Sequence, residues 1–122
     1  MASLDQISQS MEQWAPLDTA ASWDNVGCLI GSTRESIFNV AVTLEVNADT
    51  FVTLQRMPVD CVITHHPLIF KPLDRISTES WLENTIRYFI KENIALYCAH
   101  TNLDVAKGGV NDCLMRQYPI SI

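Results

Sequence analysis

The residues of this sequence that are best suited to chemistry are its three histidines, His65, His66 and His100. Each follows a run of apolar, β-favouring residues, as expected where a buried strand ends. Asp104 comes shortly after His100, and Glu45 closes another apolar run. A single histidine is more often a hydrogen-bonding residue than a ligand, but this clustering favours a metal site. Imidazole and carboxylate ligands together suit Zn, Fe, Mn, Co or Ni, and the spacing does not select among these metals.

The adjacent pair His65 and His66 sets a geometric expectation for the site. Neighbouring side chains on an extended segment point to opposite sides, so the two imidazoles are expected to bind different ions of a pair. Asp104 is expected to reach between the ions, which would lie roughly 3.5–4 Å apart and activate water against a phosphoryl or carbonyl oxygen. Two simpler interpretations stay open, in which His65 caps the strand end and His66 faces solvent.

The elements that position these residues alternate between strand and helix. A short strand is predicted at 28–31, and three further strands, joined by helices, are predicted at 39–45, 60–64 and 94–99. Because strand–helix–strand crossovers give parallel neighbouring strands, the carboxyl ends of these strands are expected side by side, and Glu45 is expected near the histidines. We therefore expect an α/β fold in one domain over residues 1–122, with a mainly parallel sheet flanked by helices.

Capping residues predict where the helices begin. Ser3 starts a capping box with the glutamine three residues later, and Asn47 caps a short second helix. A longer third helix begins near Thr78, with Ser80 as the alternative cap. A last helix follows a pair of glycines and is expected to end at Pro119.

Other polar positions have simpler interpretations. Trp23 is expected in the core, and Asp24 and Asn25 are expected to be turn residues that bond to nearby backbone. A ligand role for Asp24 is possible, but its spacing does not support one. Lys71 and Arg75 follow the histidine pair and are candidates to hold a substrate phosphate, although a solvated surface pair is the more common arrangement.

Composition narrows the classes of function. The net charge of −6, with eight scattered Lys and Arg, argues against a general nucleic-acid binder. The four cysteines form no C-x-x-C pair, so buried free thiols in a reducing compartment are expected. Neither a signal peptide nor an apolar run of about 20 residues is evident. We therefore expect a cytoplasmic protein without a membrane span.

Four blocks of the sequence resemble the NIF-three-like family, whose members are often labelled GTP cyclohydrolase type 2 homologues. The blocks are 22–27 (SWDNVG), 64–73 (THHPLIFKPL), 99–104 (AHTNLD) and 108–112 (GGVND). They occur in family order, and the histidine-pair block is the most specific of them.

This resemblance implies an α/β protein that binds two divalent metals and assembles as a toroidal hexamer. His65 and His66 match the family's paired histidine ligands and Asp104 matches its aspartate ligand, while His100 and Glu45 are candidates for a surrounding layer. Members of the family have a second half that brings a further His and Glu to the metals. The sequence has no histidine after His100 and resembles the N-terminal half alone.

Two functions are consistent with these features. The first is a metal-dependent hydrolase of a nucleotide-like substrate. The second is a metal-binding or regulatory interaction module without catalysis, because a site with the ligands of one half is incomplete for two ions.

Overall fold

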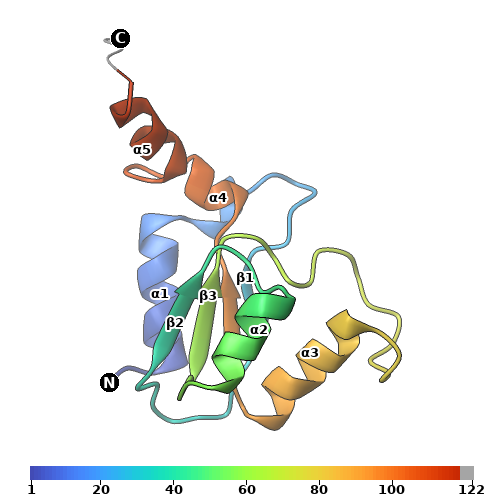
Figure 1. Cartoon of the computed structure of the whole chain (residues 1–122). Coiled ribbons are helices and arrows are strands. Elements are labelled where there is room, and N and C mark those ends of the chain that lie inside the picture. The colour runs from blue at the N-terminus through green and yellow to red at the C-terminus, as the bar shows by residue number, and fades with distance from the viewer. Residues whose placement is uncertain (119–122) are drawn as a thin grey trace.

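The computed structural model describes residues 1–118 and contains a four-stranded sheet with the strand order β1-β4-β3-β2 (Figure 1). The strands are β1 (Gly27–Ile30), β2 (Val40–Thr43), β3 (Cys61–Thr64) and β4 (Ala95–Cys98). Strands β2, β3 and β4 are parallel, as the crossovers predict, whereas β1 pairs antiparallel with β4. The expected α/β fold with a mainly parallel sheet is confirmed.

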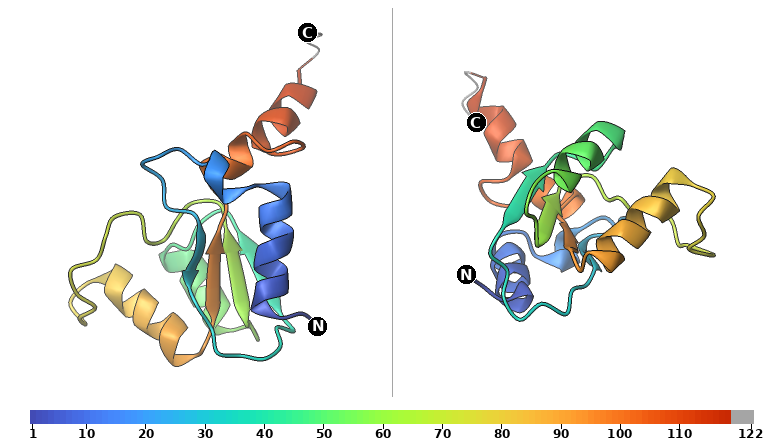
Figure 2. Two further views of the ribbon diagram at one scale, coloured as in Figure 1. Left: turned by 180° about the vertical axis from the view of Figure 1, so that it is seen from behind. Right: turned by 60° about the horizontal axis from the view of Figure 1, so that its bottom comes forward.

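Helices cover both faces of this sheet (Figures 1 and 2). The helical elements of the described residues are α1 (Leu4–Trp14), the 3-10 turn η1 (Leu17–Thr19), α2 (Ala48–Gln55), α3 (Trp81–Lys91), α4 (Thr101–Asp104) and α5 (Val110–Arg116). Helix α1 packs on one face, where Leu4 and Ile7 contact buried Cys61 and Ala95. Helices α2 and α3 lie on the other face, and α4 and α5 lie beyond the carboxyl ends of the parallel strands.

Burial explains why the two central strands carry the site. Every residue of β4 is buried, and Val62 and Leu96 pack with Ile86 and Phe89 of α3 in the main core. In the register of the sheet, Thr43 pairs with Thr64 and Thr64 pairs with Cys98. The carboxyl ends of β2, β3 and β4 are therefore level, and the residues that follow them emerge side by side.

Strands β1 and β2 are the two edges of the sheet, and one face of β2 is apolar and not covered by a helix. Val40 and Val42 alternate along the strand and are 43% and 78% exposed. Phe38 and Leu44, which flank the strand at the same spacing, are exposed as well. Alternation places Val40 and Val42 on a common face of the strand, and the exposed Phe38 and Leu44 lie just before and just after it.

The predicted caps of the first three helices are present. The side chains of Ser3 and Asn47 accept hydrogen bonds at the starts of α1 and α2, each in a capping box. Helix α3 begins at the alternative cap, Ser80, and not near Thr78. Pro119, the predicted end of the last helix, lies outside the described residues.

One expectation about buried residues is wrong, and another is confirmed only in part. Trp23 is 62% exposed and packs edge-to-face on Phe70, at 6.1 Å between ring centroids, because both belong to loops that pass outside the sheet. Cys61 and Cys98 are buried, but Cys28 and Cys113 are exposed, and all four thiols are free. Cys28 lies on an edge strand, where alternation turns every second side chain outward.

Within residues 1–118, none of the helices has the length and apolar character needed to cross a membrane.

Candidate metal centre

The three histidines meet beyond the carboxyl ends of β3 and β4. One ring nitrogen from each of His65, His66 and His100 lies within 4.8 Å of the other two. The ring centroids are separated by 5.3, 5.2 and 5.6 Å. Since metal–imidazole bonds are about 2.0–2.1 Å long, small side-chain rotations would bring all three nitrogens onto one ion.

The expectation that His65 and His66 point to opposite sides is wrong. Strand β3 ends at Thr64, and the chain bends at both histidines. Their backbone N–H groups both donate to the carbonyl oxygen of Leu44, at 3.2 and 2.8 Å. Because the backbone is no longer extended there, alternation does not apply, and the two rings lie next to each other with a 38° angle between their planes. One ion can therefore receive nitrogens from both residues.

His65 is held by the neighbouring strand end. Its Nδ1 lies 2.8 Å from the carbonyl oxygen of Ala99, directly after β4. A carbonyl can only accept, so Nδ1 carries the proton of the neutral ring and Nε2 keeps its lone pair. Nε2 lies 3.5 Å from Oδ1 of Asp104 in α4. The predicted ligands His65 and Asp104 are thus adjacent, with the free nitrogen of His65 facing the carboxylate.

His100 is held by Asp24, a residue from the loop before β1. Nδ1 of His100 lies 3.0 and 3.1 Å from the two carboxylate oxygens of Asp24. Its backbone N–H donates to the buried side chain of Asn102, which in turn donates to the carbonyl oxygen of Ala15. Both the ring and the backbone of His100 are therefore fixed from outside the histidine cluster.

Asp24 is a fully buried carboxylate whose partners are all donors. Its side chain has no exposed surface and accepts from the backbone N–H and the hydroxyl of Thr101, at 3.0 and 2.6 Å, and from the backbone N–H of Asn25. Burial by itself would raise the pKa of Asp24, but the hydrogen bonds from Thr101 and His100 outweigh burial and lower this pKa from 3.8 to about 2. The group is therefore an anion at neutral pH.

The other side of the cluster is open to solvent. His66 and Glu45 are about half exposed, at 46% and 47% of their side chains, and Nδ1 of His66 lies 3.6 Å from Oε1 of Glu45. That distance is too long for a hydrogen bond. Glu45 follows β2, as predicted, so all three parallel strands contribute a side chain to this end of the sheet.

Lys71 and Arg75, the predicted phosphate contacts, are exposed on the long loop between β3 and α3. Arg75 lines a hollow of about 280 Å³ with Ser80 and Glu83, at the start of α3. The structure thus places Arg75 beside an acidic side chain at the opposite end of this loop from the histidines.

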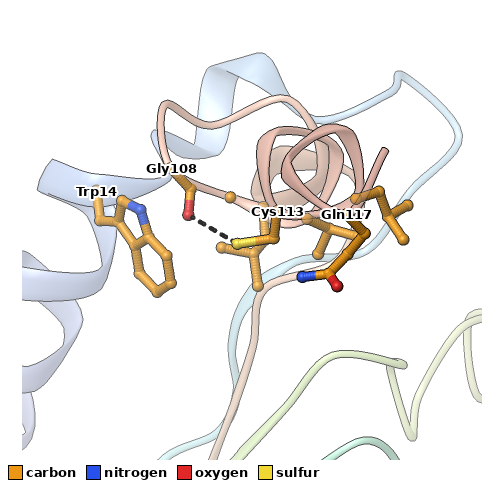
Figure 3. Close-up of a pocket in the computed structure, with 8 residues that line it drawn as sticks. Trp14, Gly108, Cys113 and Gln117 are labelled. Atoms are coloured by element: carbon orange, nitrogen blue, oxygen red, sulfur yellow. Dashed lines mark hydrogen bonds between the residues drawn. The ribbon is translucent and has the colours of Figure 1, made fainter. Parts of the chain in front are cut away.

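An apolar hollow of about 360 Å³ lies elsewhere, between Trp14 and α5 (Figure 3). The sulfur of Cys113 faces the carbonyl oxygen of Gly108 at 3.7 Å, and the indole N–H of Trp14 donates to the carbonyl oxygen of Lys107. Its lining is otherwise apolar apart from Gln117. The hollow offers an apolar surface with a single thiol, and one thiol by itself does not make a metal site.

The two buried thiols, Cys61 on β3 and Cys98 on β4, are unsuited to nucleophilic chemistry. Burial raises the pKa of Cys61 to about 11 and that of Cys98 to about 12. Both groups are therefore protonated at neutral pH, and a thiol is a far weaker nucleophile than a thiolate.

Together, the fold and the cluster define an α/β protein with imidazoles gathered at the level carboxyl ends of a parallel sheet. The family model for Duf34/NIF3 (NGG1p interacting factor 3) matches residues 2–120. The chain belongs to the Duf34/NIF3 family, which confirms the resemblance of its motifs.

Relatives with names and structures agree with this assignment. The chain is 43% identical over 116 residues to the GTP cyclohydrolase 1 type 2 homolog of Bacillus subtilis. The aligned residues cover 95% of this chain and 31% of that protein. It is 36% identical over 118 residues to NIF3-like protein 1 of Drosophila melanogaster, covering 96% and 40%. The structure of reduced HcgD from Methanocaldococcus jannaschii matches with a TM-score of 0.89 at 29% identity, covering 98% and 48%. The chain thus spans between about a third and a half of the length of these relatives.

Asp24 is the member of this constellation that the sequence did not identify. It lies 76 positions before His100, in a stretch that predicts only a turn. No local signal in the sequence identifies it, because its position depends on the antiparallel pairing of β1 with β4, in which Gly27 opposes Cys98. That pairing places the residues before β1 next to the residues after β4.

Proposed function

We propose that this chain binds a divalent metal ion at the strand ends, with His65, His66 and Asp104 as ligands. The convergence of three imidazole nitrogens within 4.8 Å supports this proposal most strongly. Asp104 adds a carboxylate next to Nε2 of His65. Zn, Fe, Mn, Co and Ni remain the candidates, because all of them accept imidazole and carboxylate ligands.

The donor set fits such an ion in its chemistry. Nδ1 of His65 is occupied by a backbone carbonyl, so Nε2 is the nitrogen available to a metal. Second partners of this kind are typical of metal-binding histidines, since they fix the ring and raise the basicity of the ligand nitrogen. The side chain of His65 is mostly buried whereas that of His66 is half exposed, so the site has both a support and an entry path.

We further propose that the chain is part of a metal-dependent hydrolase acting on a nucleotide-like substrate. The relatives named GTP cyclohydrolase 1 type 2 homolog support this class of substrate. A bound divalent ion supplies Lewis acidity and lowers the pKa of its water. The open side at His66 and Glu45 leaves room for a substrate oxygen. Of the two predicted phosphate contacts, Lys71 remains our candidate, because Arg75 lies beside Glu83 at the start of α3.

Metal titration of the purified chain tests the proposal. We expect wild-type protein to bind zinc or cobalt with a defined stoichiometry, and His65→Ala and His66→Ala to bind less. Asp18→Asn is the control, because Asp18 is exposed on η1. Equal metal content in all four proteins would contradict the proposal.

A second candidate function is a metal-binding or regulatory module without catalysis. The number of donors favours it, because three histidines and one adjacent aspartate suffice for one ion rather than a pair. Added Mn, Fe or Zn would then raise the melting temperature without hydrolysis of GTP or phosphoesters. Clear hydrolysis that is lost in Asp104→Ala would reject this candidate in favour of the hydrolase.

We also propose that residues 1–122 form one domain of a cytoplasmic homo-oligomer, for which the family resemblance suggests a hexamer. The uncovered apolar face of β2 supports self-association, since contiguous exposed apolar patches mark interaction surfaces. The free thiols support a reducing compartment. Sedimentation of the purified chain checks the subunit count, and a monomer at all concentrations would contradict the oligomer.

A further inference from the structure

We propose that Asp24 is a positioning residue that fixes the tautomer and orientation of His100, so that Nε2 of His100 is a third imidazole ligand of the metal. This inference rests on the proposed metal site and goes beyond it in two respects. It makes His100 a direct ligand instead of part of a surrounding layer, and it assigns a role to a loop residue far away in sequence.

The contacts of His100 determine which nitrogen is free. Asp24 has only acceptor atoms when ionised, and both of its oxygens lie within 3.1 Å of Nδ1 of His100. Nδ1 must therefore carry the proton of a neutral ring. The lone pair of His100 is then on Nε2, just as the lone pair of His65 is on Nε2 through its bond to Ala99.

Asp24 is itself held in place by groups that leave it no other orientation. Oδ2 accepts from the backbone N–H and the hydroxyl of Thr101, whereas Oδ1 accepts from the backbone N–H of Asn25. The Thr101 hydroxyl in turn accepts from the backbone N–H of Ala21. A buried carboxylate fixed by donors on both oxygens is the kind of outer partner that orients a metal-bound histidine.

The substitution Asp24→Asn makes a specific prediction about the tautomer. Two donors from Thr101 face Oδ2 and one donor from Asn25 faces Oδ1, so the amide oxygen of Asn is expected at Oδ2 and its NH₂ group at the place of Oδ1. That place lies 3.0 Å from Nδ1 of His100, so the NH₂ group would donate to Nδ1 and favour the proton on Nε2. The nitrogen that faces the cluster would then lack its lone pair.

Long-range ¹H–¹⁵N NMR of the imidazoles reads this tautomer directly in the metal-free chain, at about pH 8, where an ordinary histidine is neutral. Single substitutions of the three histidines assign the signals. We expect the Nδ1–H tautomer for His100 in wild type and the Nε2–H tautomer in Asp24→Asn. An Nε2–H tautomer in wild type would overturn the inference.

Zinc affinity, measured by competition with a chelator, is the second readout. We expect Asp24→Asn to weaken binding by about 10–100-fold, the usual effect of losing an outer partner. Asp18→Asn makes the same chemical change at an exposed position and is expected to leave both readouts unchanged. If Asp24→Asn keeps both the wild-type tautomer and the wild-type affinity, the inference is wrong.

Thr101→Val separates positioning from a purely structural role. It removes one donor to Asp24 but keeps the carboxylate against His100. A structural role predicts that both variants lose stability and neither changes the tautomer, whereas positioning predicts a changed tautomer in Asp24→Asn alone. A wild-type chain that binds no zinc would contradict the proposed function, and the tautomer measurement on the same metal-free sample would still decide the role of Asp24.

Discussion

The two sides of the histidine cluster are held by the fold in different ways. One side, here called the β4 side, consists of His65 and His100. Each of these residues has Nδ1 bound to a fixed acceptor, and their side chains are only 20% and 22% exposed. The other side, here called the β2 side, consists of His66 and Glu45, whose side chains are about half exposed and lie 3.6 Å from each other. The difference follows from the sheet, because β4 is a buried central strand and β2 is an exposed edge.

This contrast indicates that the two sides contribute differently to metal binding and to access. The β4 side is oriented before any ligand arrives, so little side-chain entropy is lost there on metal binding. The β2 side is free to move, which suits exchange of water and entry of a substrate. Affinity is therefore expected to depend on the β4 side and access on the β2 side.

The largest expected effect compares one histidine from each side. His65→Ala is expected to lower zinc affinity by more than about 100-fold, since losing only an outer partner already costs about 10–100-fold. His66→Ala is expected to cost less, because its ring must be ordered on binding. Isothermal titration of both variants gives the comparison, and a larger loss in His66→Ala would reverse the assignment of the two sides.

The next effect concerns acid stability through Asp24. Its pKa is lowered from 3.8 to about 2 in the folded chain, so the carboxylate stabilises the fold above about pH 4 and this contribution is lost as the pH falls toward 2. A shift of this size corresponds to about 2 kcal/mol of unfolding free energy. Urea unfolding is expected to show the stability difference between wild type and Asp24→Asn shrinking by this amount across that window. A difference that stays constant with pH would disagree with the structure, and Asp18→Asn serves as the control.

A smaller effect is expected for the support behind Asp24. Thr101→Val removes the hydroxyl that donates to the carboxylate and accepts from the backbone N–H of Ala21, and a hydrogen bond to a charged group contributes about 1.5–3 kcal/mol. Because the backbone N–H of Thr101 still donates to Asp24, we expect a loss at the lower end of this range, about 1.5 kcal/mol of unfolding free energy. Thermal unfolding measures the change, and Thr78→Val, at an exposed threonine before α3, is the matched control. Equal losses in the two variants would show that the hydroxyl of Thr101 does not stabilise Asp24.

The smallest effect is expected at Glu45. The pair with His66 is half exposed and longer than a hydrogen bond, and such surface pairs contribute about 0–1 kcal/mol. Glu45→Gln is therefore expected to change zinc affinity by less than about fivefold. A loss as large as that of His65→Ala would show that Glu45 is itself a ligand, and the β2 side would then be part of the metal shell.

Much of the fold follows from local pattern in the sequence. The apolar runs before Glu45, His65 and His100 predict three strands, and the crossover rule makes them parallel. The caps Ser3 and Asn47 predict two helix starts directly. These features depend on contacts or hydrogen bonds within a few residues, or on a rule that holds for nearly every such unit.

The remaining features depend on contacts between distant segments. The antiparallel docking of β1 beside β4 has no local signal, and without it Asp24 reads as an ordinary turn residue. The bend at His65 and His66 depends on the carbonyl of Leu44, at the end of another strand. The exposure of Trp23 depends on the path of a loop around the sheet, which hydrophobicity alone does not determine.

The pairing of Asp24 with His100 also has a consequence for the kinetics of folding. It joins positions 76 residues apart and requires β1 to dock on a strand that is synthesised much later. Contacts of such high sequence separation carry the cost of closing a long loop, so they form late. The ring of His65, by contrast, is oriented as soon as β3 and β4 pair, across 34 residues. During refolding, the site is thus expected to acquire its first oriented imidazole before its second.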